Sequence, residues 1–201
     1  MLDESMSFIE AYIQEHDALG QMYTSSNVSH ESNWQAPPEY VVKFNFDSSF
    51  DSSSRSATTG VVGQNNLGFI MAACSIPHRN VADAFVPEAY ACRQAVLFAK
   101  ESGFSRVIVE GDSLSVIKKL NSDEAERSTI YPIVHDIKVL SRDFSSISYC
   151  FARRGANNVA HVLAQEYRSN PGPCYWVEEA PAAATVASEL DRRRLAQSQT
   201  L

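Results

Sequence analysis

The chain has 201 residues, an apolar fraction of 44% and a formal net charge of −7, which allow one domain with a substantial core, with or without tails. No apolar run reaches the roughly 18 residues of a membrane span, and the acidic N-terminus lacks the basic and apolar regions of a secretory signal. We therefore expect an intracellular protein, nuclear or cytoplasmic, that is neither secreted nor in a membrane. The four cysteines form no close pair, so neither a zinc knuckle nor a disulfide framework is indicated.

The negative charge is concentrated at the ends of the chain. Residues 1–32 contain six acidic residues and no lysine or arginine, whereas residues 33–170 contain fourteen residues of each sign. A neutral central part does not by itself point to nucleic acid, although a local basic patch would be enough to bind it.

Composition divides the chain into three parts. Residues 1–33 form an acidic segment and linker, with a short amphipathic helix expected over residues 1–22. Residues 34–169 carry the regular apolar patterns of a folded domain. Residues 170–201 are rich in proline, glycine and alanine and are expected to be a disordered tail, with a short helix near residues 188–197.

The alternation of residues 40–47 predicts the first strand of the domain. One face is apolar (Tyr40, Val42, Phe44, Phe46) and the other, mostly polar face ends at a carboxylate (Val41, Lys43, Asn45, Asp47). A carboxylate in such a strand is costly unless a partner or a cation compensates its charge. After a polar turn over residues 48–56, strands are expected at 57–63 and 67–75, joined by a tight hairpin at Asn65 and Asn66.

The clearest helix is predicted over residues 86–102. Pro87 lies in its first turn and Gly103 just past its end, the expected asymmetry of helix ends. Glu88 stands at the N-terminal end of a stripe of small residues that suits close packing on a sheet. Alternatively, Glu88 is a first-turn glutamate that only favours the helix dipole.

The rest of the domain alternates strands and helices. Residues 106–111 form a short apolar strand, Asp112 and Ser113 open a helix, and a parallel crossover is expected there. An N-cap is the alternative role for Asp112. A helix over residues 130–143, a fifth strand over residues 146–151 and a last helix over residues 157–167 complete an α/β domain.

Three carboxylates stand at corresponding places in this arrangement. If the fourth strand pairs in parallel with the first, Asp47 and Asp112 meet at neighbouring carboxyl ends, where open α/β sheets collect ligands, and Glu88 can reach them from its helix. Clustered carboxylates stay ionised only if cations neutralise them. Oxygen ligands favour Mg²⁺ or Mn²⁺, and two such ions about 4 Å apart hydrolyse phosphodiesters in known sites.

A series of short motifs runs through residues 34–167. They are Trp34-x-x-Pro37-Pro38, Lys43-x-Asn45-x-Asp47, Gly60-Val61-Val62, Gly68, Pro87-Glu88-Ala89-x-Ala91, Glu110-Gly111-Asp112-Ser113 and Arg154-x-x-Asn157-x-Val159-Ala160-His161-x-Leu163-Ala164. In this order and spacing they resemble the ribonuclease H-like domains of plant retroelement-derived proteins.

The resemblance implies a five-stranded mixed sheet, three antiparallel strands followed by parallel ones, flanked by helices. It implies cleavage of the RNA strand of an RNA–DNA hybrid with two Mg²⁺, and it makes Asp47, Glu88 and Asp112 the metal ligands. Candidate hydrogen-bond donors to the nucleic-acid backbone or 2′-OH are Ser48, Ser49 and Asn157. Arg153 and Arg154, just before the last helix, could hold a phosphate or form a solvated turn.

Two positions depart from the family pattern. The first aspartate is usually followed by glycine but here by Ser48, and His161 stands where active bacterial and viral members have a fourth aspartate. A neutral imidazole is a softer ligand than a carboxylate, so metal affinity should fall and the preference of the site should shift toward Mn²⁺. His161 either packs the last helix or orients a water or a proton near the acids.

The sequence thus predicts a monomeric endonuclease acting on RNA–DNA hybrids, with Asp47, Glu88, Asp112 and His161 at its catalytic site. The alternative is a domesticated domain, weakened or inactive, that binds nucleic acid or protein without cutting. An exonuclease on the same fold is a third and weaker hypothesis.

Overall fold

The computed structural model describes residues 33–81, 83, 85–122 and 128–198. The helix expected over residues 1–22 therefore lies outside the described residues. None of the described helices is long and apolar enough to cross a lipid bilayer. All four cysteines are free thiols, as their spacing predicts.

The described residues form a single mixed sheet with strand order β5-β4-β1-β2-β3-β6. Strands β1, β2 and β3 are antiparallel neighbours, β4 and β5 run parallel to β1, and β6 is antiparallel to β3. The strands are β1 Val42–Asp51, β2 Ser56–Gln64, β3 Ile70–His78, β4 Arg106–Gly111, β5 Ser146–Phe151 and β6 Cys174–Val177.

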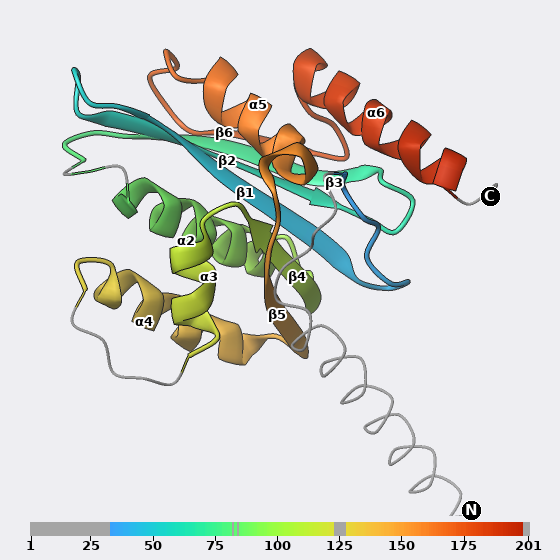
Figure 1. The fold of residues 1–201 in the computed structure, drawn as a ribbon, viewed down its shortest axis with the longest axis horizontal. Helices are drawn as coiled ribbons and strands as arrows, with labels where there is room; N and C mark the ends of the chain where they lie inside the picture. Colours follow the sequence, from blue (N-terminus) through green and yellow to red (C-terminus); the bar gives the residue numbers. More distant parts are fainter. Residues whose placement is uncertain (1–32, 82, 84, 123–127, 199–201) are drawn as a thin grey trace, which may run out of the picture.

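Helices cover both faces of this sheet (Figure 1). One face carries α2 (Phe85–Glu101), α3 (Leu114–Leu120) and α4 (Tyr131–Leu140), the last extended by a 3-10 turn, η1 (Ser141–Asp143). The other carries α5 (Asn158–Glu166), preceded by the 3-10 turn η2 (Arg154–Asn157), and α6 (Ala182–Ser198). The predicted α/β fold, with three antiparallel strands followed by parallel ones, is confirmed.

The two faces of β1 differ in polarity as the alternation predicts. Phe44 and Phe46 are fully buried in the larger core, beneath α2, and the Phe44 ring meets Phe98 and Phe104 edge-on. Lys43, Asn45 and Asp47 point to the opposite face and are also buried. Buried polar groups need partners, and this requirement applies to all three side chains.

A chain of hydrogen bonds meets part of that requirement. Trp34 Nε1 donates to Asn45 Oδ1 at 3.0 Å, Asn45 Nδ2 donates to Asn157 Oδ1 at 3.2 Å, and Asn157 Nδ2 donates to the Phe46 carbonyl at 2.7 Å. Lys43 forms an internal ion pair with Glu110 of β4, with an N–O distance of 2.5 Å. The segment before β1 and the start of α5 are thereby tied to the central strand.

The first strand is longer than predicted. β1 runs to Asp51 and pairs with β2 throughout, so that only residues 52–55 form the turn. The serines at positions 48 and 49 are accommodated because each lies opposite a threonine of β2, and small polar pairs suit a sheet. Tyr40, assigned to the apolar face of the strand, instead precedes it and is 85% exposed.

The expectation of a disordered tail after residue 170 differs from the structure. Residues 174–177 add β6 beside β3, giving six strands rather than five, and α6 packs on the polar face of the sheet. Ala184 and Ala187 of α6 are buried with Val62 and Ala73, and Ser188 Oγ donates to the Gly68 carbonyl at 3.0 Å. Alanine is a strong helix former and allows close approach, so this composition serves packing rather than disorder.

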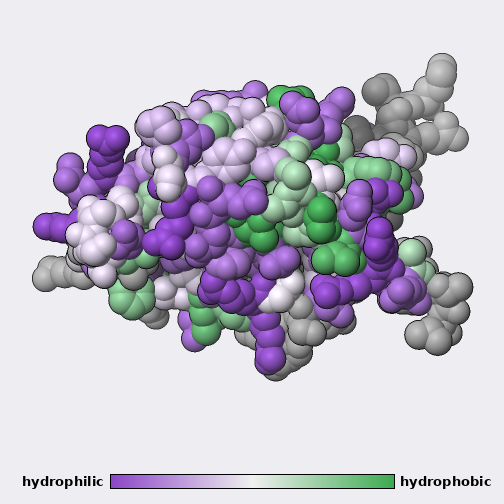
Figure 2. All heavy atoms as spheres, turned by 90° about the horizontal axis from the view of Figure 1, so that it is seen from above, coloured by the Kyte–Doolittle hydropathy of each residue, from purple (hydrophilic) through white to green (hydrophobic). Residues whose placement is uncertain are grey.

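Seen from the side of α5 and α6, the molecule is mostly hydrophilic, with a few strongly hydrophobic side chains near the middle of the view (Figure 2). Both Val186 and Leu190 of α6 are exposed on the surface. The helix α5 lies close against β2 because Gly60 has no side chain. A Cβ at Gly60 would lie 2.5 Å from the Ala160 carbonyl oxygen and 2.6 Å from the Ala164 amide nitrogen.

We predict that Gly60→Ala destabilises the protein, because the added methyl would meet backbone atoms of α5 that cannot rotate away. The expected loss is about 3 kcal/mol in the free energy of unfolding, the upper part of the range for overpacking, measured by urea denaturation. Gly172→Ala is the matched control, since a Cβ there meets nothing within 4 Å. Equal stability of the two variants would contradict the close packing of α5 on β2.

Candidate active site

Three carboxylates from separate elements meet where the pairing of β1 with β4 stops, which is the end of β4 but the middle of β1, not its end as predicted. Asp47 lies on β1, Glu88 in the first turn of α2, and Asp112 directly after β4. One oxygen from each residue can be chosen so that all three lie within 4.8 Å of one another. The parallel pairing of β1 with β4, in which Phe46 lies opposite Gly111, brings the two aspartates to the same edge.

Asp47 is the most enclosed member of this acid cluster, which we define as Asp47, Glu88 and Asp112. It is 2% exposed, its Oδ1 accepts a hydrogen bond from the Ser48 amide at 2.9 Å, and its Oδ2 lies 2.7 Å from Nδ1 of His161. Burial and the charge of Asp112 raise the pKa of Asp47, while the contacts with His161 and the Ser48 amide lower it. On balance the pKa is raised.

Glu88 has one oxygen satisfied and one without a partner. Its Oε1 accepts from the Ser48 hydroxyl at 2.5 Å, whereas Oε2 is buried and has no hydrogen-bond partner among the described residues. Burial raises the pKa of Glu88 to about 8, with smaller contributions from the charges of Asp47 and Asp112. The helix dipole alone therefore does not explain Glu88, since its carboxylate faces other acids rather than solvent.

Asp112 is not the N-cap of α3. Ser113 occupies that position, and it makes no side-chain capping bond. The carboxylate of Asp112 is directed instead toward the cluster, and its Oδ2 lies 4.0 Å from Nη1 of Arg154. Arg154 is mostly exposed, so this ion pair is weak by itself.

His161 joins the cluster from α5. Because a carboxylate can only accept, the 2.7 Å contact with Asp47 assigns the ring proton to Nδ1 of His161. Nη2 of Arg154 lies 3.0 Å from both ring nitrogens, and only Nε2 then has a lone pair to accept from it. The imidazole thus faces the site rather than serving only to pack α5.

The donor set of the cluster fits a divalent cation. Three carboxylates provide hard oxygen ligands of the kind that Mg²⁺ and Mn²⁺ prefer, and the unpartnered, buried Oε2 of Glu88 lacks the compensation that a cation would supply. The residues that would hold such an ion are Asp47, Glu88 and Asp112. One oxygen of Asp47, Oδ2, already accepts a hydrogen bond from His161.

The five candidate substrate contacts lie in different surroundings. Ser48 is directed to Glu88, and Arg154 reaches Asp112 and His161, so both border the cluster. Arg153 is exposed at the start of η2. Ser49 is 4% exposed and lies two residues beyond Asp47 on β1. Asn157 is 1% exposed with its amide hydrogen-bonded inside the protein, so in this structure it supports the fold and does not reach a surface.

A family model described as reverse transcriptase-like matches residues 45–167, more than half of the chain. The chain belongs to this reverse transcriptase-like family. No sequence among the curated proteins matches it.

Several solved structures share the fold of this reverse transcriptase-like domain. RNase H1 from the halophilic archaeon Halobacterium salinarum has 23% identity and a TM-score of 0.59, with 65% of this chain and 98% of that chain covered. The N-terminal RNase H domain of a Mycobacterium tuberculosis protein has 19% identity and a TM-score of 0.58, over 64% and 94%. LC11-RNase H1, isolated from compost by a metagenomic approach and solved with an RNA/DNA hybrid, has 17% identity and a TM-score of 0.56, over 62% and 94%.

These similarities establish a ribonuclease H-like fold for the domain. The sixth strand and α6 begin after residue 167, beyond the part that the family model matches. The predicted family is therefore supported at the level of the fold and of the reverse transcriptase-like domain.

We predict that Glu88→Gln stabilises the cation-free protein in a pH-dependent manner. The pKa of Glu88 in the folded protein, about 8, is above its ordinary value of 4.5, so folding loses stability as pH rises from about 4.5 through 8. Glutamine cannot ionise, and its advantage should grow over the same range. A gain on the order of 1 kcal/mol would raise Tm by ~2–4 °C, measured by thermal denaturation in EDTA.

Glu101→Gln, at the exposed end of the same helix, is the control. It should leave the pH dependence of Tm unchanged. Adding Mg²⁺ should raise the Tm of the unsubstituted protein more than that of Glu88→Gln. A pH-independent effect of Glu88→Gln would show that repulsion and burial at this site are not linked to folding.

Proposed function

We propose that this domain is a metal-dependent endonuclease that hydrolyses the RNA strand of RNA–DNA hybrids. The observation that carries the proposal is the convergence of three carboxylate oxygens within 4.8 Å, one of the side chains having an unpartnered buried oxygen. Support comes from the ribonuclease H-like fold and from a structural neighbour, LC11-RNase H1, whose structure contains an RNA/DNA hybrid.

In this proposal Asp47, Glu88 and Asp112 hold two Mg²⁺, or Mn²⁺. When bound, such ions supply the activation of an attacking water and the stabilisation of the leaving oxygen. Two residues of the chain have supporting roles. Ser48 holds the Glu88 carboxylate in place, and the buried position of Asp47 limits the access of bulk water.

His161 and Arg154 complete the proposed site. The Nδ1–H of His161 stays hydrogen-bonded to Asp47, and Nε2, which accepts from Arg154 in this structure, serves for proton exchange or water orientation once Arg154 pairs with a phosphate. Arg154 is exposed, and its guanidinium could pair with the scissile or an adjacent phosphate. We further propose a monomer of plant retroelement origin that acts inside the cell, in the nucleus or cytoplasm.

Hybrid cleavage tests this proposal directly. A hybrid with an internal label in the RNA strand should be cut in Mg²⁺ or Mn²⁺ and not in EDTA, and Asp47→Asn should lower the rate roughly 10²–10³-fold or more, as loss of one preorganised charge does in other enzymes. Asp136→Asn, an exposed carboxylate of α4 paired with Arg93, is the matched control. A circular hybrid without free ends separates an endonuclease from an exonuclease.

A second candidate is a domain that binds hybrids without cutting them. It is favoured by the contacts of Arg154 and His161, because the charge of Arg154 and the hydrogen bond from His161 both stabilise the carboxylates without any cation. Unsubstituted protein and Asp47→Asn would then bind a hybrid equally, and neither would cleave it in Mg²⁺ or Mn²⁺.

His161→Asp provides a separate prediction about metal affinity. The change adds an oxygen ligand beside Asp47, so the affinity for Mg²⁺ should rise roughly tenfold, or ~1.4 kcal/mol, in a calorimetric titration. The same change places like charges together, so the cation-free protein should have a lower Tm. His161→Asn, which adds no charge, should do neither. Unchanged Mg²⁺ binding by His161→Asp would indicate that this position lies outside the cation site.

A further inference from the structure

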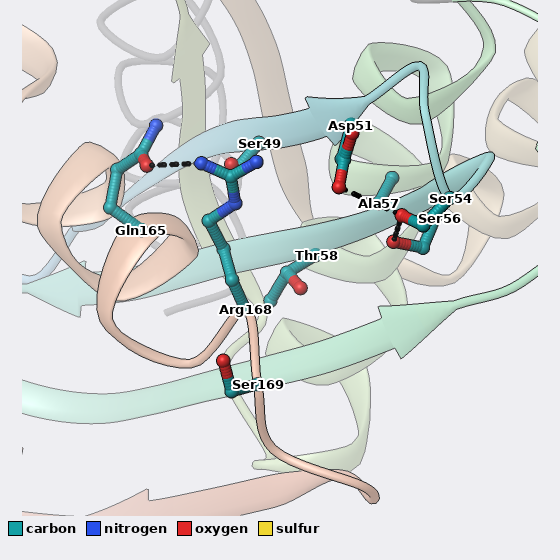
Figure 3. Close-up of a pocket in the computed structure, with 9 residues that line it drawn as sticks. All are labelled: Ser49, Asp51, Ser54, Ser56, Ala57, Thr58, Gln165, Arg168 and Ser169. Carbon is teal, nitrogen blue, oxygen red and sulfur yellow. Dashed lines mark hydrogen bonds between the residues drawn. The ribbon is translucent and has the colours of Figure 1, made fainter.

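A second concave site lies on the α5 face of the sheet, between the β1–β2 hairpin and the end of α5 (Figure 3). Its volume is about 440 Å³, within the range of small-molecule sites. The lining is polar, and the side chains used below are Ser49 and Asp51 of β1, Thr58 of β2, and Gln165, Arg168 and Ser169 at the end of α5.

Two largely buried residues of this pocket have hydroxyls with no hydrogen-bond partner among the described residues. Ser49 is 4% exposed and Thr58 is 2% exposed, and neither side chain makes a hydrogen bond within the described part of the chain. The Ser169 hydroxyl is likewise unpaired among the described residues. None of the three is among the buried side-chain oxygens that lack a partner in the described part of the chain, so these hydroxyls reach solvent and are available to a ligand that accepts hydrogen bonds.

Arg168 supplies the positive charge of the pocket. Its Nη1 donates one long hydrogen bond, 3.4 Å, to Gln165 Oε1, and the rest of its guanidinium forms no ion pair with any residue in the described ranges. Figure 3 shows the side chain extended from the end of α5 over the strands. A guanidinium with free donors beside hydroxyls matches the geometry of a phosphate group.

Asp51 limits where an anion can sit. It lies at the hairpin end, where Ser53 and Ser54 donate three hydrogen bonds to its carboxylate. These bonds lower the pKa of Asp51 to about 2, so it stays charged. A phosphate would therefore bind at the Arg168 end, between the arginine and the hydroxyls.

Two elements that line the pocket, β1 and α5, also carry residues of the candidate active site. Asp47, Ser49 and Asp51 alternate on one face of β1, so Ser49 lies ~7 Å beyond Asp47 at the usual strand rise. On α5, His161 and Gln165 are four residues apart and share a face, and Arg168 follows just past the helix end. With 3.4 Å of axial rise per nucleotide, the pocket lies about two to three nucleotides from the acids.

We infer that this pocket is a subsite for a backbone phosphate of the nucleic-acid strand that crosses the acid cluster, with Arg168 as its charged contact. The inference rests on the proposed function for the identity of the strand. Ser49, Thr58 and Ser169 donate hydrogen bonds to the phosphate oxygens, and the subsite sets the register of the strand without reading its bases.

Binding in EDTA tests the subsite apart from cleavage. The full chain is titrated against a labelled RNA–DNA hybrid by fluorescence anisotropy over a series of KCl concentrations. Arg168→Ala should weaken binding roughly tenfold for every sequence and reduce the slope of log K against log salt by about 1. Arg168→Lys should preserve the slope, and Thr58→Val should lower affinity while leaving the slope unchanged. Arg142→Ala, an exposed arginine on the opposite face of the sheet, is the control.

The outcomes separate this inference from the nuclease proposal. If Arg168→Ala matches Arg142→Ala in affinity and slope, the subsite is wrong, whether or not the protein cleaves hybrids. If Arg168→Ala loses affinity and slope but the unsubstituted protein never cleaves, the subsite stands and the nuclease proposal fails. Absence of hybrid binding by the unsubstituted protein would overturn both.

Discussion

The parallel pairing of β1 with β4 is the constraint on which the candidate site depends. It places Phe46 opposite Gly111, so that Asp47, which continues in β1, and Asp112, the residue directly after β4, lie side by side where this pairing stops. The close contact is possible because Gly111 has no side chain, as a Cβ there would lie 2.4 Å from the Phe46 ring. The larger core, in which Phe46 packs beneath α2, thus also holds the acids together, and α2 brings Glu88 to the same point.

Neighbouring groups partly stabilise the negative charge of the acid cluster. Ser48 stands where the resemblance expects glycine, and its hydroxyl binds Glu88 while its amide binds Asp47. From the α5 side, His161 donates a hydrogen bond to Asp47, and the charge of Arg154 offsets part of the remaining negative charge. The raised pKa values of Asp47 and Glu88 reflect how incomplete this compensation is when burial is included. A site of this kind is under electrostatic strain that binding of a cation relieves.

Buried polar groups determine the packing on the face of the sheet that carries α5. The hydrogen bonds from Trp34 through Asn45 to Asn157 fix the start of α5 behind β1, and the absence of a side chain at Gly60 lets the helix come close. The same helix carries His161 at the acid cluster and ends beside Arg168 at the polar pocket. β6 and α6 then cover the sheet beyond the part shared with the family.

Local pattern in the sequence determined the elements and their order. The alternation of β1, the proline and glycine at the ends of α2 and the strand at residues 146–151 were predictable, because period and end signals depend on neighbouring residues. The carboxylates could be identified as a candidate set, since strand order implied a common edge. Only the tertiary structure decided the rest: that Asn157 is buried, that Ser48 faces Glu88, and that Arg168 borders a pocket with Ser49 and Thr58. It also decided that residues 174–198 fold, because their stability comes from burial of small residues on β2 and β3, a contact between distant segments that local composition does not encode.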